Sequence, residues 1–242
     1  MVSRGEQNQT AKDRRQKLAE LRRQQQAAER RRTILLVSLS VLIGLGLIGA
    51  AAAPIAIKWY NDPARKPVSA FGVSASAAAC DPVITDPATG NGDHVGPGSQ
   101  KPDVTTVRYA TVPPTSGQHW AFPAPFERKF YTAQDRPRME ELVHNLEHGY
   151  TVVWYDDTIK GAELQALKDL AGKIPKDPRT SKFIVSAWDP AYGEFPAGKH
   201  VAMSRWTSKN GVRQLCGKVS GEAIAEFMKK YPQADAPEPN GA

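Results

Sequence analysis

The chain has little cysteine and little histidine. Its two cysteines, Cys80 and Cys216, are far apart in the sequence, and this spacing excludes the Cys-x-x-Cys motif of a thiol redox centre. Only five histidines are present among 242 residues. Two histidines that lie close together in such a sequence are therefore informative about its chemistry.

One long segment also lacks charged residues. Residues 33–57 contain no charged residue and consist mainly of Leu, Ile, Val, Ala and Gly. Because about 20 apolar residues cross the hydrocarbon core of a bilayer, this segment is predicted to be a transmembrane helix. Trp59 and Tyr60 follow as an interfacial anchor. The apolar stretch exceeds the roughly 7–15 residues of a signal peptide, which favours an uncleaved anchor over a cleaved signal.

Positive charge is concentrated at the N-terminus. Residues 1–32 hold ten basic and four acidic residues, so they account for +6 of the net charge of +7. We expect this tail to be cytoplasmic and the chain after the helix to lie outside. Because the rest is nearly neutral, the pI of 9.4 does not indicate binding to nucleic acid. The tail is expected either to touch anionic lipid head groups or to be a solvated helix without a partner.

The predicted topology places both cysteines in an oxidising compartment. Their even number favours a disulfide between Cys80 and Cys216 over a pair of thiolate metal ligands. Residues 58–79, rich in Pro, Ala and Ser, are predicted to be a linker. The extracytoplasmic domain is expected to span residues 80–232, and residues 233–242 are predicted to be a disordered tail.

Hydrophobic periodicity divides the external domain into short elements. Strands are predicted at 104–112, 151–155, 183–188, 201–206 and 212–216, and helices at 135–148, at 161–174 and after Ser220. From residue 150 onward the order is β-α-β-β-β-α. This order predicts an α+β fold, with a small mixed sheet and helices on one face. It is similar to the second half of a thioredoxin-like domain, although the redox motif is missing.

Two of the histidines, His144 and His148, occupy one predicted helix. They are four residues apart, so their imidazoles share one helix face, an arrangement that binds transition metals. The run His-x-x-Glu-His also matches a short zinc peptidase motif. In that hypothesis Glu147 is the general base, and Glu222 or Glu226 is the third zinc ligand. The motif is short enough to arise by chance, and the domain is smaller than such peptidases.

Further histidines come from loops. His119 follows a stiff Pro-Pro-Thr-Ser-Gly turn, and His94 lies in a glycine-rich loop. Either one would complete a site with the helical pair, and several neutral imidazoles suit Cu(II) or Zn²⁺. His200 is expected to be an ordinary strand residue. Met203 is predicted to face the opposite side of that strand, away from any such site.

Residues 113–119 and 142–149 carry a resemblance to a known family. With their PPTSGxH and LVHNLEHG patterns, they resemble the bacterial domain-of-unknown-function family 3105. The similarity covers roughly residues 80–232, with Gln118 standing where the family pattern has proline. It implies an N-terminal membrane anchor and an external domain, and no particular reaction. It also implies one constellation made of His119, His144, Glu147 and His148.

Three hypotheses follow for a protein of the bacterial cell envelope. The favoured one is a copper- or zinc-binding module, which is not expected to be an enzyme. The alternatives are an interaction module with a structural histidine cluster and a zinc hydrolase that uses Glu147. The expected partners are the membrane, through residues 33–57, and proteins of the envelope, but not nucleic acid. The predicted metal ligands are His94, His119, His144 and His148.

Overall fold

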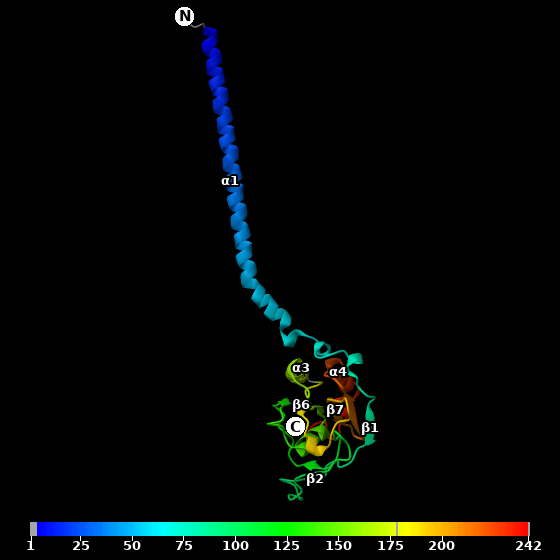
Figure 1. Cartoon of the computed structure of the whole chain (residues 1–242). Helices are drawn as coiled ribbons and strands as arrows, with labels where there is room; N and C mark the ends of the chain where they lie inside the picture. The colour runs from blue at the N-terminus through cyan, green and yellow to red at the C-terminus, as the bar shows by residue number, and fades with distance from the viewer. Residues whose placement is uncertain (1–3, 178, 242) are drawn as a thin grey trace. The chain divides into compact units, whose positions relative to one another are not determined.

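The structure is a computed structural model that describes residues 4–177 and 179–241. The chain forms two compact units, Met1–Asp62 and Pro63–Ala242. The first unit contains α1 (Arg4–Asn61), drawn in blue to cyan in Figure 1. The segment Arg14–Asn61 is long and apolar enough to cross a membrane. It includes the predicted transmembrane segment, so α1 is a candidate membrane span.

The second unit is built on a mixed six-stranded sheet in the order β1-β8-β7-β5-β6-β4. The β4–β6 and β5–β6 pairs are parallel, and the others are antiparallel. A separate parallel pair joins β2 to β3. The α+β class and the mixed sheet are confirmed. The strands are β1 (Ile84–Pro87), β2 (His94–Val95), β3 (His119–Trp120), β4 (Phe130–Tyr131), β5 (Thr151–Tyr155), β6 (Phe183–Ala187), β7 (Val201–Trp206) and β8 (Asn210–Cys216).

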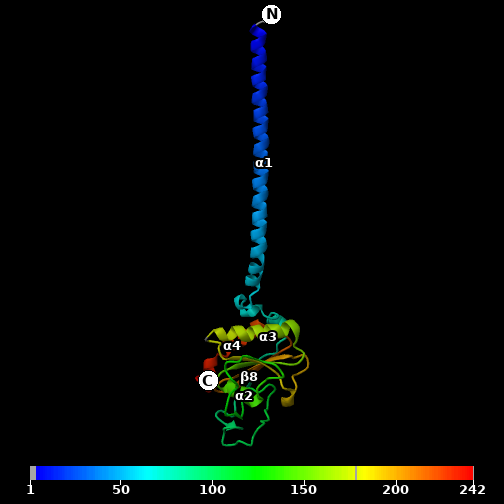
Figure 2. The same ribbon diagram turned by 90° about the vertical axis from the view of Figure 1, so that its left-hand side faces the viewer.

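Helices cover both faces of this sheet, as Figure 2 shows. On one face, α3 (Gly161–Lys173) and α4 (Gly221–Lys230) pack through Leu167, Leu170 and Phe227. On the other face, α2 (Met139–Glu147) buries its apolar stripe against a second cluster that includes Trp154 and Trp206. The expectation of helices on one face therefore holds for α3 and α4, but not for α2. The physical reason is that β5, β6 and β7 are buried along their whole length, so both faces need a cover.

Most predicted elements after residue 150 match the observed ones within two residues. The predicted strand at 104–112 is wrong, because this segment has no strand pairing. The Val107 N–H donates instead to the buried Glu140 carboxylate, at 2.8 Å. The helix predicted from Asp135 begins only at Met139. Asp135 accepts hydrogen bonds from Thr132, so it closes a turn before the helix and does not cap it.

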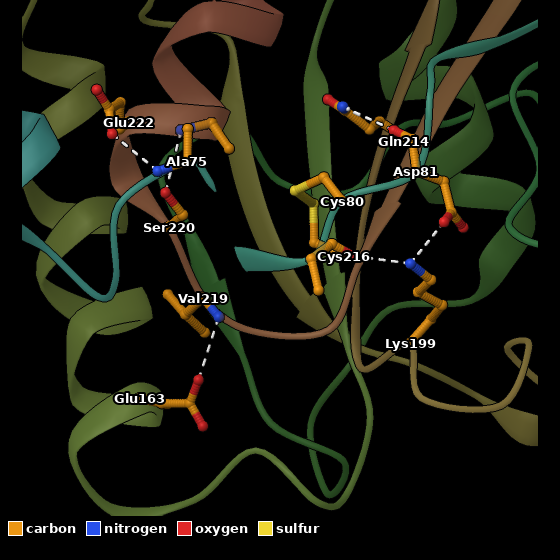
Figure 3. Close-up of a disulfide and its surroundings, with 12 residues drawn as sticks. Ala75, Cys80, Asp81, Glu163, Lys199, Gln214, Cys216, Val219, Ser220 and Glu222 are labelled. Atoms are coloured by element: carbon orange, nitrogen blue, oxygen red, sulfur yellow. Dashed lines mark hydrogen bonds and ion pairs between the residues drawn. A yellow bond between two sulfur atoms is a disulfide. The ribbon is translucent and has the colours of Figure 1, made fainter. Parts of the chain in front are cut away.

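The predicted disulfide between Cys80 and Cys216 is present, joining the segment before β1 to the end of β8 (Figure 3). The segment before it, predicted to be a linker, packs onto the domain. Phe71 is buried in the α3/α4 core, and the Ala75 N–H donates to Glu222 at 2.8 Å. Burial of one aromatic side chain contributes about 1.5–3 kcal/mol, which explains why a segment of linker-like composition is held in place.

The C-terminal segment differs from its prediction as well. Residues 233–241 were expected to be disordered, but they follow a defined path that starts with a 3-10 helix, Gln233–Asp235. Ala236 is buried, and the Ser208 N–H donates to the Asp235 carbonyl at 2.6 Å. Composition alone suggested disorder, whereas specific backbone hydrogen bonds to other parts of the domain hold this segment.

Candidate metal centre

The candidate site lies where α2 meets the small β2–β3 pair. The α2 helix forms because Leu142, Val143 and Leu146 bury one stripe against the sheet. It ends at Glu147, and Gly149, with a φ of +87°, turns the chain away two residues later. The polar side of its last turns faces β2 and β3. In that pair, His94 and His119 occupy matching positions in the register. Helix and loops thus bring residues from three separate parts of the sequence to one place.

Three histidines and one carboxylate converge there. One potential ligand atom from each lies within 4.8 Å of those of the others. The rings of the three histidines are mutually adjacent, with centroid distances of 4.9–5.0 Å. Three of the four residues are buried, and the fourth, His94, has 37% of its side chain exposed. The group consists of His94, His119, His144 and Glu147.

Backbone carbonyls fix the orientation of two of these imidazoles. Nδ1 of His119 lies 2.8 Å from the Gly117 carbonyl, and Nδ1 of His144 lies 2.6 Å from the Trp120 carbonyl. A carbonyl only accepts, so each Nδ1 carries the proton and donates it. In a neutral imidazole the other nitrogen, Nε2, then carries a lone pair. The Nε2 of His119 faces the Glu147 carboxylate, whereas the Nε2 of His144 lies 3.0 Å from Nε2 of His148.

Three buried polar atoms at the centre of the cluster lack a hydrogen-bond partner among the described residues. His119 Nε2 lies 2.9 Å from Glu147 Oε2, and His94 Nε2 lies 3.9 Å from the same oxygen. Within the described part of the chain, these three atoms have no hydrogen-bond partner. The other carboxylate oxygen, Oε1, accepts the Gly92 N–H at 2.7 Å. Buried acceptors without a donor cost about 1–3 kcal/mol each, unless a proton or a cation lies between them.

The surroundings of His144 and Glu147 favour the protonation states that bind metals. Burial lowers the pKa of His144 to about 4, and the neighbouring histidines act in the same direction. Burial acts to raise the pKa of Glu147, but His119 and the Gly92 N–H outweigh burial and lower it. At neutral pH, His144 is therefore a neutral imidazole and Glu147 a carboxylate. Metal ligation requires these protonation states.

His148 lies beside this group. Its Nε2 is 3.0 Å from Nε2 of His144, and its side chain is almost completely buried. Its Nε2 also lies 3.4 Å from Oε2 of Glu238 in the C-terminal segment. His148 thus belongs to a second group of potential ligands, which comprises Glu147, His148 and Glu238. His144 and His148 are in contact, as predicted for a pair on one helix face, but they belong to two adjacent groups of potential ligands that share Glu147.

Residues around the cluster hold its two loops together. Gln118, next to His119, donates to Asp93 at 2.7 Å, and Lys101 donates to the other oxygen of Asp93 at 2.8 Å. These hydrogen bonds to Lys101 and Gln118 lower the pKa of Asp93. A cavity of about 490 Å³ opens beside them, and its lining includes His94. The cluster is therefore reached from solvent on the His94 side.

Several residues considered from the sequence lie elsewhere. The Glu222 carboxylate binds the Ala75 N–H near the disulfide, as Figure 3 shows, and Glu226 is exposed on the same helix, α4. Neither is a third ligand, because α4 covers the opposite face of the sheet from α2. His200 binds Asp156 at 2.8 Å, outside the cluster. Met203 belongs to the α3/α4 core, also on the opposite face.

Sequence reasoning missed two participants. Glu238 was assigned to a disordered tail, although the flanking prolines in Pro-Glu-Pro would have indicated a stiff, extended segment. Trp206 ends the predicted strand 201–206, and its ring packs edge-on against His119 at a centroid distance of 5.7 Å. This contact supports the imidazole from behind. No local pattern links Trp206 to a histidine 87 positions earlier.

Comparison with known proteins gives one match. A family model described as "Protein of unknown function (DUF3105)" matches residues 100–242. The chain belongs to this family. The DUF3105 match includes His119, α2 and the C-terminal segment with Glu238, whereas His94 precedes it. No curated protein and no solved structure matches the chain.

Proposed function

We propose that the external unit is a metal-binding module and that His94, His119, His144 and Glu147 hold a divalent transition-metal ion. One observation carries the proposal: His119 Nε2 and Glu147 Oε2 face each other at 2.9 Å, both are buried, and neither has a hydrogen-bond partner among the described residues. The His119 Nδ1–H donates to the Gly117 carbonyl, so the neutral form of this ring has a lone pair on Nε2. A metal ion between these atoms satisfies both lone pairs at once.

The ligand types favour zinc or copper(II). Three imidazoles and one carboxylate form a nitrogen- and oxygen-rich set of borderline hardness, which suits Zn²⁺ and Cu²⁺. The soft ligands that select Cu(I) are absent from this group, since both cysteines form a disulfide and Met203 lies in the opposite core. In this arrangement Glu147 acts as a ligand, and the function is metal binding or delivery.

The proposed location is the outer side of a bacterial cell membrane. The candidate span α1 provides the anchor, and the basic residues that precede the apolar stretch favour a cytoplasmic N-terminus. The disulfide supports an oxidising environment for the unit that follows. A metal-binding module placed there would take up or hand over ions outside the cytoplasm.

The direct test is metal content. The full-length protein, purified in detergent and equilibrated with Zn²⁺ or Cu²⁺, is expected to retain metal after gel filtration. The double variant His119→Ala/His144→Ala removes two of the four ligands, so it is expected to lose this metal. His200→Ala is the matched control, because His200 binds Asp156 and lies outside the cluster. Equal, negligible metal in all three proteins would overturn the proposal.

A further inference from the structure

The C-terminal segment, residues 233–241, is fixed against the end of α2; we name it the strap. The Glu238 N–H donates to the Glu147 carbonyl at 3.0 Å. The ammonium group of Lys182 donates to the carbonyls of His148, Pro239 and Gly241 at 2.6–2.8 Å. The backbone of Gly241 lies so close to the His148 ring that a Cβ there would come within 2.5 Å of it. The strap is thus held mainly through its backbone, which leaves the Glu238 side chain available.

We propose that the strap completes a second cation site made by Glu147, His148 and Glu238. One potential ligand atom of each lies within 4.8 Å of the others, and Glu238 Oε2 is 3.4 Å from His148 Nε2. Glu147 is fully buried, and its Oε2 makes no hydrogen bond within the described residues. This inference deepens the proposed function and rests on it, since Glu147 is shared with the first site.

A carboxylate can serve two cations because its two oxygens have about four acceptor positions between them. In Glu147, the Gly92 N–H occupies one of these positions. The remaining positions are enough to reach both groups of ligands. Carboxylates that bridge two cations in this way are common in two-metal sites. The sharing also predicts that the two sites fill interdependently.

The local charge favours a cation here. The two carboxylates carry a charge of −2, and the ammonium group of Lys182, which holds the strap, is directed at backbone carbonyls. Lys182 has three donors, and all three bind backbone carbonyls. A divalent ion with nitrogen and oxygen ligands, such as Zn²⁺, balances this charge. Because 46% of the Glu238 side chain is exposed, the second site is expected to be weaker than the buried one and to exchange faster.

The test measures the stoichiometry of Zn²⁺ binding to the full-length protein in detergent. Isothermal titration calorimetry is the method. The wild type is expected to bind two equivalents in two steps. Glu238→Gln keeps the size of the side chain and every backbone hydrogen bond of the strap, and it is expected to lose the weaker step alone. Glu226→Gln, which removes an exposed carboxylate from α4, is the matched control and is expected to keep both steps.

The outcomes separate this inference from the proposed function. One equivalent in the wild type, unchanged in Glu238→Gln, overturns the second site and leaves the first intact. Two equivalents in both proteins also overturn the role of Glu238. No bound zinc in any of the proteins overturns both proposals. Loss of one step in Glu238→Gln, with both steps kept in Glu226→Gln, supports the second site.

Discussion

Replacing Glu147 by glutamine distinguishes a metal site from a structural ion pair. The two hypotheses predict changes of opposite sign in the free energy of unfolding of the metal-free protein. Glutamine has nearly the same shape as glutamate, and its carbonyl can still accept the Gly92 N–H. Its amide nitrogen then takes the place of Oε2, 2.9 Å from His119 Nε2. Two facing acceptors become a donor and an acceptor. In the metal-free protein, Glu147→Gln is therefore expected to be stabilising.

The magnitude follows from the contacts. The new hydrogen bond contributes about 1 kcal/mol, and removing an unsatisfied buried oxygen contributes about 1–3 kcal/mol. The hydrogen bond from Gly92 loses its charged acceptor, which costs about 1 kcal/mol. The net gain in the free energy of unfolding is about 1–3 kcal/mol. Affinity for Zn²⁺ is expected to fall by more than about 100-fold, beyond the typical effect of residues that only support ligands.

The assay is urea unfolding in the presence of a chelator, with tryptophan fluorescence as the readout. Glu226→Gln is the control for the loss of one exposed carboxylate. If His119 were instead an imidazolium paired with Glu147, the substitution would break a buried ion pair. Breaking such a pair costs about 3–5 kcal/mol. A destabilisation of that size in the metal-free protein would refute the assignment of His119 as a neutral ligand.

Three further predictions test the surroundings of the site. Asn145→Ala leaves the buried N–H and C=O of Ala124 without partners, and should lower the free energy of unfolding by about 2–4 kcal/mol in urea. The pKa of His144 falls from 6.5 to about 4 on folding, so the unfolded chain binds a proton more readily than the folded one between these pH values. The free energy of unfolding of the metal-free protein should therefore fall by up to about 3 kcal/mol as the pH drops from 6.5 to 4, and His144→Asn should reduce this loss. Replacing Cys80 and Cys216 by serine should cost about 2–5 kcal/mol without changing zinc stoichiometry, since the bridge lies away from α2.

Much of the fold could be predicted because local patterns agree with the tertiary structure. The strands at 151–155 and 201–206 are short, β-branched or aromatic runs, and they appear with those bounds. The last helix was predicted to follow Ser220, and the Ser220 side chain caps it by accepting the Ala223 N–H. The segment 104–112 failed because Val107, its buried residue, donates its N–H to the Glu140 carboxylate and not to a neighbouring strand. Periodicity reports burial and leaves the hydrogen-bond partner open.

The site was predictable in part for a related reason. The spacing of His144 and His148 placed both on one helix face, which local geometry fixes. Their meeting with His119 and His94 depends on the β2–β3 pair, whose strands have two residues each and leave almost no periodic signal. The role of Glu238 depends on backbone hydrogen bonds of the strap to Ser208 and Glu147. Composition says nothing about such long-range bonds.

The choice of donors around the cluster argues against a purely structural role. A histidine cluster that only filled space would direct nearby N–H groups at its lone pairs, since unsatisfied buried acceptors are costly. Suitable donors exist here. Gln118 is adjacent to His119, yet its amide binds Asp93, and the Gly92 N–H binds the carboxylate of Glu147 and no imidazole. Carbonyls meanwhile hold Nδ1 of His119 and His144, which turns both Nε2 lone pairs inward. Hydrogen bonds thus orient the ligands from outside and leave three buried atoms at the centre, His94 Nε2, His119 Nε2 and Glu147 Oε2, without a partner among the described residues, as a cation site requires.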